Sequence, residues 1–169
     1  MDGEFVGVAQ FGCMMNPHAT ERIVRDTHWK DALELNRLWV HDKAPRNTES
    51  RFISYCIKFI RKVEPNAKWI QSFADERCGR FGVLYQACNF LYLGEHTSSF
   101  YECDGEWFHK LIATNLKDRF NQPKCKRLTA ALSEGRAKEV KLRQFRYLYF
   151  LDPRKRKYLV MEIKPYPKH

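Results

Sequence analysis

Apolar and polar residues alternate in two stretches near the start of the chain, which predicts two strands joined by a loop. Residues 4–12 form the first strand and residues 33–40 the second, while residues 13–28 between them lack a period. Within the second strand the apolar parity changes between Leu35 and Leu38. A phase change of one residue inside a strand predicts a β-bulge at that point.

A helical period then replaces the alternation. The apolar positions of the next segment lie three and four residues apart, at Ile53, Cys56, Ile57, Ile60 and Val63. They predict an amphipathic helix over Thr48–Val63, with Asn47 as its N-cap. A short strand at residues 68–73 and a second helix at residues 82–89 follow.

The rest of the chain holds two predicted hairpins separated by a basic segment. Residues 100–109 form two short strands around Asp104-Gly105, a dipeptide that favours a two-residue hairpin turn. Residues 114–142 are basic and in part compatible with helix. A basic C-terminal hairpin is predicted over residues 145–163, with its turn at residues 152–155. Together the elements predict one mixed α/β (α+β) domain over residues 1–169.

The composition fits a globular protein. Of the 169 residues, 44% are hydrophobic and 14% aromatic, which excludes a wholly disordered chain. No apolar run reaches the ~20 residues of a membrane span, and the first residues lack a signal-peptide pattern. These features predict a cytoplasmic protein without a membrane partner. The six cysteines form no C-x-x-C pair and the histidines show no ligand spacing, so no metal site can be assigned.

The net charge of +10 is unevenly distributed, because Lys and Arg far outnumber acids in residues 110–169. This bias favours a polyanion partner, although solubility alone would also explain it. Basic residues alternate with aromatic ones near the C-terminus, a pattern that can neutralise phosphates and stack on bases. The candidate DNA-binding residues are Arg143, Arg146, Tyr147, Arg154, Lys155, Arg156 and Lys157, with Trp107 as a further candidate.

Two residues are candidates for proton transfer. Tyr85 lies early in the predicted second helix, where a phenol can protonate a departing group, and Asp75 follows the preceding strand, where a carboxylate can accept a proton from an amine. A core tyrosine and a loop-capping aspartate are the structural alternatives. The helix N-terminus near Ser50 can bind a pyrophosphate, and the bulged strand can hold an extended acyl-carrier chain. We expect Tyr85 and Asp75 to face each other across a split in the sheet.

These segments resemble the GNAT acyltransferase superfamily. Leu84-Tyr85 followed by Asn89-Phe90 is similar to the helix motif that carries the family's general acid. The resemblance implies a mixed, largely antiparallel sheet with a splayed central strand pair flanked by helices. It also implies acetyl-CoA or a related acyl donor. The family's glycine-rich pyrophosphate loop is replaced by residues 46–51, which contain no glycine.

A narrower resemblance is to the Mom-type phage DNA-modification proteins. It is carried by five strings: Asn36-Arg37-Leu38-Trp39-Val40, Asn47-x-x-Ser50-Arg51-Phe52-Ile53, Ser72-Phe73-Ala74-Asp75, Tyr85-Gln86-Ala87-x-Asn89-Phe90 and Arg146-Tyr147. The resemblance implies conversion of adenine in double-stranded DNA to an N6-carbamoylmethyl form that protects phage DNA from restriction. It also implies a link to iron, without ligands that the sequence identifies.

The same resemblance implies site residues. The expected catalytic residues are Arg37, Ser50, Asp75 and Tyr85. The expected cofactor-binding residues are Leu38, Trp39, Val40, Asn47, Ser50, Arg51 and Asn89. Both families have more chain before residues 4–12, so we expect the first elements of the fold to be absent or shortened. A general acyl-CoA-dependent N-acyltransferase acting on a protein or small amine, and a non-catalytic basic DNA-binding module, remain as alternative functions.

Overall fold

The structure is a computed structural model that describes residues 4–79, 81–110 and 123–168. Its centre is a six-stranded sheet with the strand order β1-β2-β3-β6-β4-β5. The strands are β1 (Gly7–Gly12), β2 (Ala32–Val40), β3 (Trp69–Asp75), β4 (Leu91–Cys103), β5 (Glu106–His109) and β6 (Lys138–Phe150). Only β2 and β3 are parallel, and the other neighbours are antiparallel. The expected mixed, largely antiparallel sheet is therefore confirmed.

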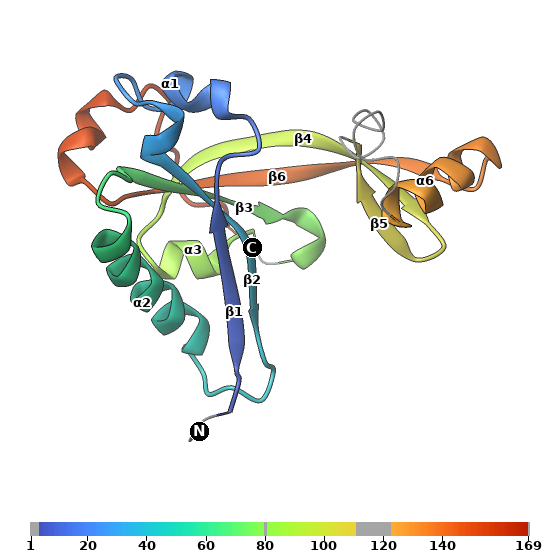
Figure 1. The fold of residues 1–169 in the computed structure, drawn as a ribbon, viewed down its shortest axis with the longest axis horizontal. Helices are drawn as coiled ribbons and strands as arrows, with labels where there is room; N and C mark the ends of the chain where they lie inside the picture. The colour runs from blue at the N-terminus through green and yellow to red at the C-terminus, as the bar shows by residue number, and fades with distance from the viewer. Residues whose placement is uncertain (1–3, 80, 111–122, 169) are drawn as a thin grey trace.

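The sheet splits between its two parallel strands. The strands β2 and β3 pair only from Ala32 opposite Trp69 to Glu34 opposite Gln71, after which they diverge. Figure 1 shows β1 and β2 running away from the other strands beyond this point. The register of β1 against β2 shifts so that Asn36 is the extra residue, which is the bulge that the parity change predicted.

Two apolar clusters lie on opposite faces of the sheet. We call the first the helix face: α2 (Thr48–Val63) and α3 (Val83–Ala87) cover it with a core that includes Ile57, Phe90 and Tyr147. We call the other the second face. There α1 (Thr20–Ile23) and the segment after β6 cover a core that includes Trp69 and Leu148. Short 3-10 helices span Pro17–Ala19 (η1), Trp29–Asp31 (η2), Glu76–Cys78 (η3) and Pro153–Tyr158 (η4).

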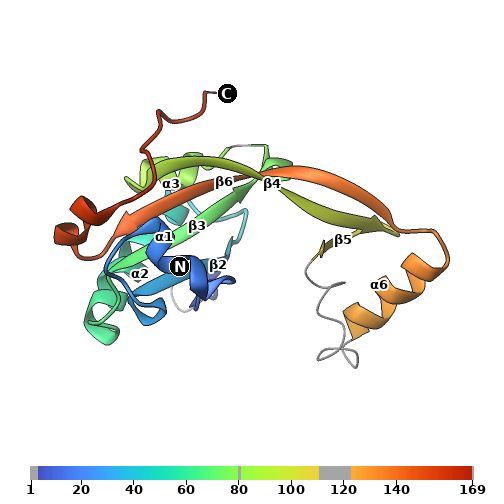
Figure 2. The same cartoon turned by 90° about the horizontal axis from the view of Figure 1, so that it is seen from above.

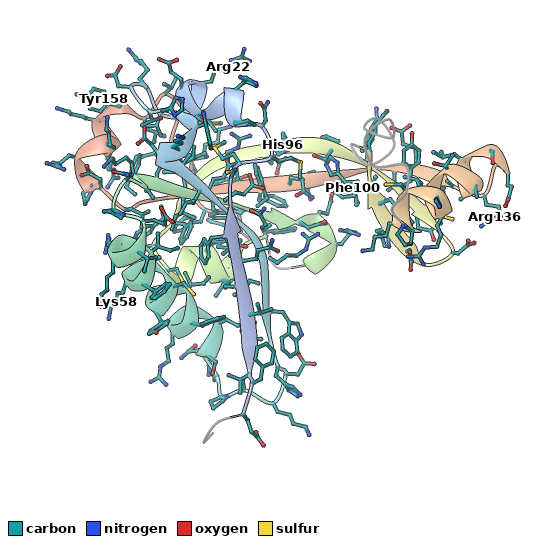
Figure 3. The ribbon with its side chains drawn as sticks, in the orientation of Figure 1. Arg22, Lys58, His96, Phe100, Arg136 and Tyr158 are labelled. Atoms are coloured by element: carbon teal, nitrogen blue, oxygen red, sulfur yellow. The ribbon has the colours of Figure 1, made fainter. Side chains whose placement is uncertain are left out.

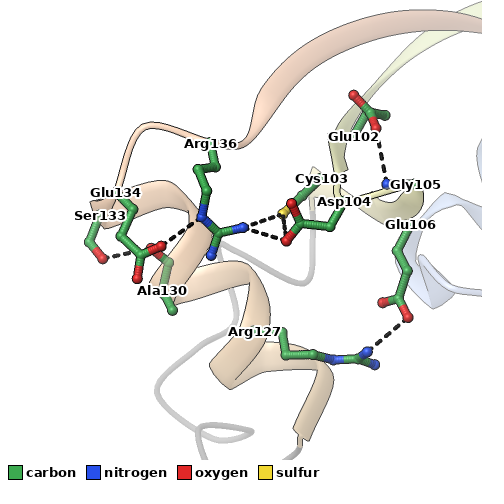
Figure 4. Close-up of polar contacts among 10 residues, drawn as sticks. All are labelled: Glu102, Cys103, Asp104, Gly105, Glu106, Arg127, Ala130, Ser133, Glu134 and Arg136. Carbon is green, nitrogen blue, oxygen red and sulfur yellow. Dashed lines mark hydrogen bonds and ion pairs between the residues drawn. The ribbon is translucent and has the colours of Figure 1, made fainter.

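The far halves of β4 and β6, together with β5 and α6 (Pro123–Ser133), form an arm that stands away from the rest of the molecule (Figure 2). The arm has a small core of its own, made by Cys103, Phe108, Leu128 and Ala131. Ion pairs fasten α6 to the β4–β5 turn (Figure 4): Arg136 bonds Asp104 and Glu134, and Arg127 bonds Glu106. The predicted hairpin at residues 100–109 is confirmed.

The predicted C-terminal hairpin is wrong. Residues 153–158 form η4, and the chain then leaves β6, with the N–H of Val160 donating to Ile23 and that of Lys164 to Tyr92. The reason is that β3 and β4 occupy both edges of β6, so no edge is open to a returning strand. Asn47 precedes α2 as expected but has φ +67° and makes no side-chain cap. The basic segment 114–142 was predicted to be helical in part, and it contains α6. Residues 114–122 of this segment lie outside the described part of the chain.

Candidate functional site

Two hollows flank the N-terminal half of α2. The first, of about 340 Å³, opens between α2 and α3 and is lined by Ser50, Arg51, Ser54, Tyr55, Lys58 and Ala87. The second, of about 270 Å³, lies toward the ends of β1 and β2 and is lined by Val6, Gly7, Val40, Thr48, Arg51 and Phe52. Arg51 borders both hollows. The predicted cofactor residues Val40, Ser50 and Arg51 are thus brought together at this helix tip.

The residues at these hollows fit a phosphate-bearing acyl carrier. The first hollow combines hydroxyl groups with the cations Arg51 and Lys58 beside the positive end of a helix dipole, which suits phosphates. The lining of the second hollow is mainly apolar, which suits an extended chain. Ser50 reinforces the first turn, since its hydroxyl donates to the Asn47 carbonyl at 3.0 Å.

Other predicted cofactor residues lie apart from the hollows. Leu38 packs against the helix-face core, and the exposed Asn89 follows α3 with φ +60°. Trp39 is 48% exposed, and its ring contacts Phe5 and His41. Trp39 and Leu38 are consecutive in a strand, so alternation turns Trp39 to the second face, away from the other cofactor residues.

Tyr85 is held on the helix face by a close approach of α3 to β6. Helix α3 begins after Gly82, which has φ +83° and lies so near Tyr147 that a Cβ on it would be 2.3 Å from a ring carbon. The half-buried Tyr85 ring packs on Phe90 and Tyr147, with ring centroids 5.5 Å and 5.3 Å apart. These contacts position the Tyr85 ring on the helix face.

Asp75 ends β3 and is engaged by Arg77. Its carboxylate accepts two hydrogen bonds from the Arg77 side chain, at 2.5 Å from Nη2 and 3.0 Å from Nε, and one from the Arg77 backbone N–H at 2.9 Å. Burial pushes the pKa of Asp75 upward, but the Arg77 bonds outweigh it, so the pKa lies below its ordinary value. Asp75 is therefore a carboxylate at neutral pH.

Tyr85 and Asp75 lie on opposite faces of the sheet. Asp75 shares its strand parity with Trp69, a core residue of the second face, whereas Tyr85 packs into the helix-face core. The prediction that the two groups face each other across the split is therefore wrong. Each residue can therefore act only from its own side of the sheet.

The predicted catalytic residues Arg37 and Ser50 are also separated. Ser50 lies in the first turn of α2. Arg37 lies in β2 beyond the bulge, is exposed, and donates from Nη1 to its neighbour Asn36 at 3.0 Å. Arg37 and Leu38 are consecutive in the strand, so their side chains point to opposite faces. Leu38 packs on the helix face, and the Arg37 side chain therefore lies on the second face.

The predicted DNA-binding residues near the C-terminus fall into different environments. Tyr147 is fully buried, its hydroxyl donates to the Phe81 carbonyl, and burial raises its pKa to about 12. Base stacking by Tyr147 is therefore excluded, which corrects that prediction. Arg143 is paired with Glu76 and Glu95.

Arg146 and the basic turn also differ from each other. The Arg146 guanidinium lies over the Phe73 ring at 5.1 Å, and burial lowers its pKa. The cations Arg154, Lys155, Arg156 and Lys157 all belong to η4. Figure 3 places η4, marked by Tyr158, at the opposite end of the molecule from the tip of the arm, marked by Arg136.

Comparison with known proteins identifies the family. The sequence model of the Mom protein family matches residues 1–168. The chain belongs to the Mom protein family. It is 46% identical over 168 residues to the methylcarbamoylase Mom of Escherichia phage Mu, a match that covers 98% of this chain and 68% of the relative.

Solved structures extend the likeness to the fold of this Mom-family chain. Arabidopsis thaliana NAA60, solved with a bisubstrate analogue, is 14% identical with a TM-score of 0.51, covering 88% of this chain and 68% of that one. A candidate acetyltransferase from Acinetobacter baylyi ADP1 is 15% identical with a TM-score of 0.49, and this chain spans only 57% of its length. The likeness to NAA60 confirms the predicted GNAT-like fold.

Two further observations bear on cofactors and surroundings. Among the described residues, no group of three or more His, Cys, Asp or Glu side chains could hold a metal ion, so iron ligands cannot be named. Within the same ranges no helix is long and apolar enough to cross a membrane.

Sequence reasoning missed Arg77, the residue that engages Asp75. The only local signal was its position two residues after an aspartate at a strand end, where a side chain can bond back to the turn. It also missed Gly82 as a packing requirement, because nothing local indicates that Tyr147 passes beside it.

Proposed function

We propose that this protein transfers a carbamoylmethyl group to N6 of adenine in double-stranded DNA, in the cytoplasm of a phage-infected host, and so protects phage DNA from restriction. The observation that carries the proposal is the 46% identity, over nearly the whole chain, to a phage Mu protein named methylcarbamoylase. The net charge of +10 supports a polyanionic substrate. An adenine inside a duplex is inaccessible, so the reaction requires that the base be extruded.

The donor side of the reaction belongs to the tip of α2. We propose that acetyl-CoA or a related acyl carrier binds there. Its phosphates would lie beside Ser50, Arg51 and Lys58 in the first hollow, and its extended chain would lie in the second hollow beside Val40. A carrier that holds the –CH2–CO–NH2 group through its methylene carbon would supply that group and leave with the bonding electron pair, whereas acetyl-CoA itself, which reacts at its carbonyl carbon, would give an N6-acetyl product. Tyr85, on the same face, would give its proton to the departing atom. No step is assigned to iron.

The acceptor side belongs to the second face. When a bond forms between N6 and the transferred methylene carbon, N6 loses one proton and the leaving group keeps the electron pair. The Asp75 carboxylate lies on this face and is kept ionised by Arg77, and it would accept that proton. Arg37 lies on the same face of the sheet, on β2 across the split. In this arrangement donor and base approach from opposite faces and meet where β2 and β3 part.

Nucleoside analysis tests the proposal. DNA from cells expressing the protein is digested and its nucleosides are separated and weighed. We expect a deoxyadenosine heavier by one carbamoylmethyl group. It should be absent with empty vector and strongly reduced with Asp75→Asn, a variant close in size to the wild-type residue. Unmodified adenine from cells that contain abundant folded protein would contradict the proposal.

A general N-acyltransferase is the second candidate, because the fold resembles that of NAA60. Incubation with acetyl-CoA and small amines or peptides in the absence of DNA separates the two functions. Rapid acylation of an amine, together with unmodified DNA, would favour this second function. Salt-dependent DNA binding without any product, unchanged by Asp75→Ala and Tyr85→Phe, would instead indicate a non-catalytic DNA-binding module.

A further inference from the structure

Aromatic, histidine and arginine side chains lie in a line along the second face. Arg146 lies over the Phe73 ring at 5.1 Å, and Phe73 contacts His96 at 5.3 Å. Farther along, Phe100 contacts His109 at 4.9 Å. We call the seven residues Arg146, Phe73, His96, His109, Phe100, Arg77 and Trp107 the aromatic–cation strip. It leads from β3, beside the split, out to the arm.

Strand register places these residues on one face. Phe73 is the partner of Arg146 between β3 and β6, and Phe100 is the partner of His109 between β4 and β5. Phe108 points into the small core of the arm, so its neighbour Trp107 is turned to the other side. The strip therefore lies on the same face as Asp75, the proposed base.

Trp107 is the most exposed apolar member of the strip. Its side chain is 41% exposed, while the Arg77 guanidinium lies 4.8 Å from its ring centroid and 5.0 Å from that of Phe100. Arg77 is itself bonded to Asp75. The indole is thus supported from beneath by a cation that also contacts the proposed base.

Contacts within the arm position the short strand that carries Trp107. Arg127 bonds Glu106, the residue next to Trp107, and Arg136 ties the end of α6 to Asp104 in the adjacent turn (Figure 4). Glu102, the register partner of Trp107, is drawn to the same turn, where it accepts from the Gly105 N–H at 3.3 Å. A fixed aromatic ring with a cation beneath it loses little conformational entropy when a flat ligand stacks on it.

We propose that the aromatic–cation strip is a stacking surface for the bases of the DNA strand opened beside Asp75, with Trp107 taking an unpaired base. The inference rests on the proposed function and names the surface that receives the substrate. Extruding one adenine leaves neighbouring bases unstacked, and aromatic rings can accept them whatever their sequence. The intervening cation Arg146 favours an anionic strand over a cationic peptide.

Trp107→Ala tests the strip, and Trp29→Ala is its matched control. Both tryptophans are 41% exposed, and Trp29 also has a cation nearby, with Lys30 Nζ 5.3 Å from its ring centroid. Binding to labelled oligonucleotides is measured by anisotropy, using single-stranded DNA and a duplex with an abasic site opposite adenine. We expect Trp107→Ala to bind both about tenfold more weakly. Trp29→Ala should match wild type.

Two further measurements distinguish stacking from other causes. Trp107→Phe should restore most of the affinity because it keeps a ring, whereas Trp107→Leu should not. The salt dependence of binding should stay unchanged in Trp107→Ala, because no cation is removed. Thermal unfolding of each variant shows whether the arm is intact. If Trp107→Ala does not fold, the Phe and Leu variants decide the question.

Equal affinities for wild type and a folded Trp107→Ala, or equal losses with Trp29→Ala, would overturn the strip as a DNA surface. Cross-linking of the strip to a protein but not to DNA would also overturn it. These results leave the proposed function standing if wild-type protein still modifies adenine. Conversely, loss of single-stranded binding in Trp107→Ala, with no modified nucleoside from wild type, would support the strip and reject the enzymatic function.

Discussion

Gly82→Ala should destabilise the protein more than an alanine at any of its open glycines. Gly82 precedes α3 with φ +83°, and an added Cβ would lie 2.3 Å from Cε2 and 2.7 Å from Cζ of Tyr147. Non-bonded carbons pack at about 3.5–4 Å, so the ring would have to move by roughly 1 Å or more. Tyr147 is fully buried, and its hydroxyl is bonded to Phe81 and Gln86, which leaves the ring little room.

The expected cost has two parts. A left-handed backbone costs an alanine about 1–2 kcal/mol, and forcing extra volume into a packed core costs about 1–3 kcal/mol. Gly135 serves as the control, because it has φ +69° and nothing within 4 Å of an added Cβ. Gly135→Ala should therefore lose only the backbone part. For Gly82→Ala we expect a loss of about 3 kcal/mol, which lowers the melting temperature by about 6–12 °C in a chain of this size.

Urea unfolding of the two variants and wild type measures these losses. A double-mutant cycle adds a sharper test: Tyr147→Leu removes the ring, so Gly82→Ala should cost less in that background, with a coupling of about 1 kcal/mol or more. Equal losses for Gly82→Ala and Gly135→Ala, together with zero coupling to Tyr147, would show that α3 does not pack on β6 as described. Such a result would also remove the basis for placing Tyr85.

Three other predictions follow from the site. Arg77→Gln removes the side-chain bonds and the charge of Arg77 that lower the pKa of Asp75, while the backbone N–H of residue 77 still donates to the carboxylate, so the pKa should rise toward its ordinary value; unfolding titrations should show a stability deficit that is full at neutral pH and disappears as pH falls through the lowered pKa of wild-type Asp75. Tyr85→Phe should lower adenine modification about 100-fold or more while changing the free energy of unfolding by about 1 kcal/mol or less; a wild-type yield of modified nucleoside would reject the proton-donor role. Lys155→Glu combined with Arg156→Glu should weaken DNA binding and reduce the slope of log affinity against log salt concentration by about 2. An unchanged slope would show that η4 does not contact the DNA.

The sequence predicted correctly the elements that depend only on residues near one another in the chain. The bulge at Asn36 follows from a parity change within one strand, and the hairpin turn follows from Asp104-Gly105, whose φ values of +51° and +77° suit that dipeptide. Helix α2 also matches its predicted bounds, because the apolar period of its core-facing residues covers the whole element.

The errors arose where distant segments compete. The sequence of β6 and the residues after it fits a hairpin, but β3 and β4 take both edges of β6. The position of Asp75 was misjudged for a similar reason. The strand was predicted to end at residue 73, whereas pairing with β6 extends it until Asp75 lies opposite Gln144. Two more residues of strand fix the side to which the carboxylate points.

The basic turn and the aromatic–cation strip would contribute to DNA binding by different physics. The cations of η4 act through phosphate neutralisation, which is independent of sequence and falls with salt, whereas Trp107 acts through stacking, which requires an opened strand. The turn η4, marked by Tyr158, and the tip of the arm, marked by Arg136, lie toward opposite ends of the molecule (Figure 3), and the strip runs from β3 beside the split out to the arm. A duplex that reaches both regions would pass the point where β2 and β3 part. Salt-dependent binding to η4 would hold the duplex there, and stacking on Trp107 would favour the opened strand beside Asp75.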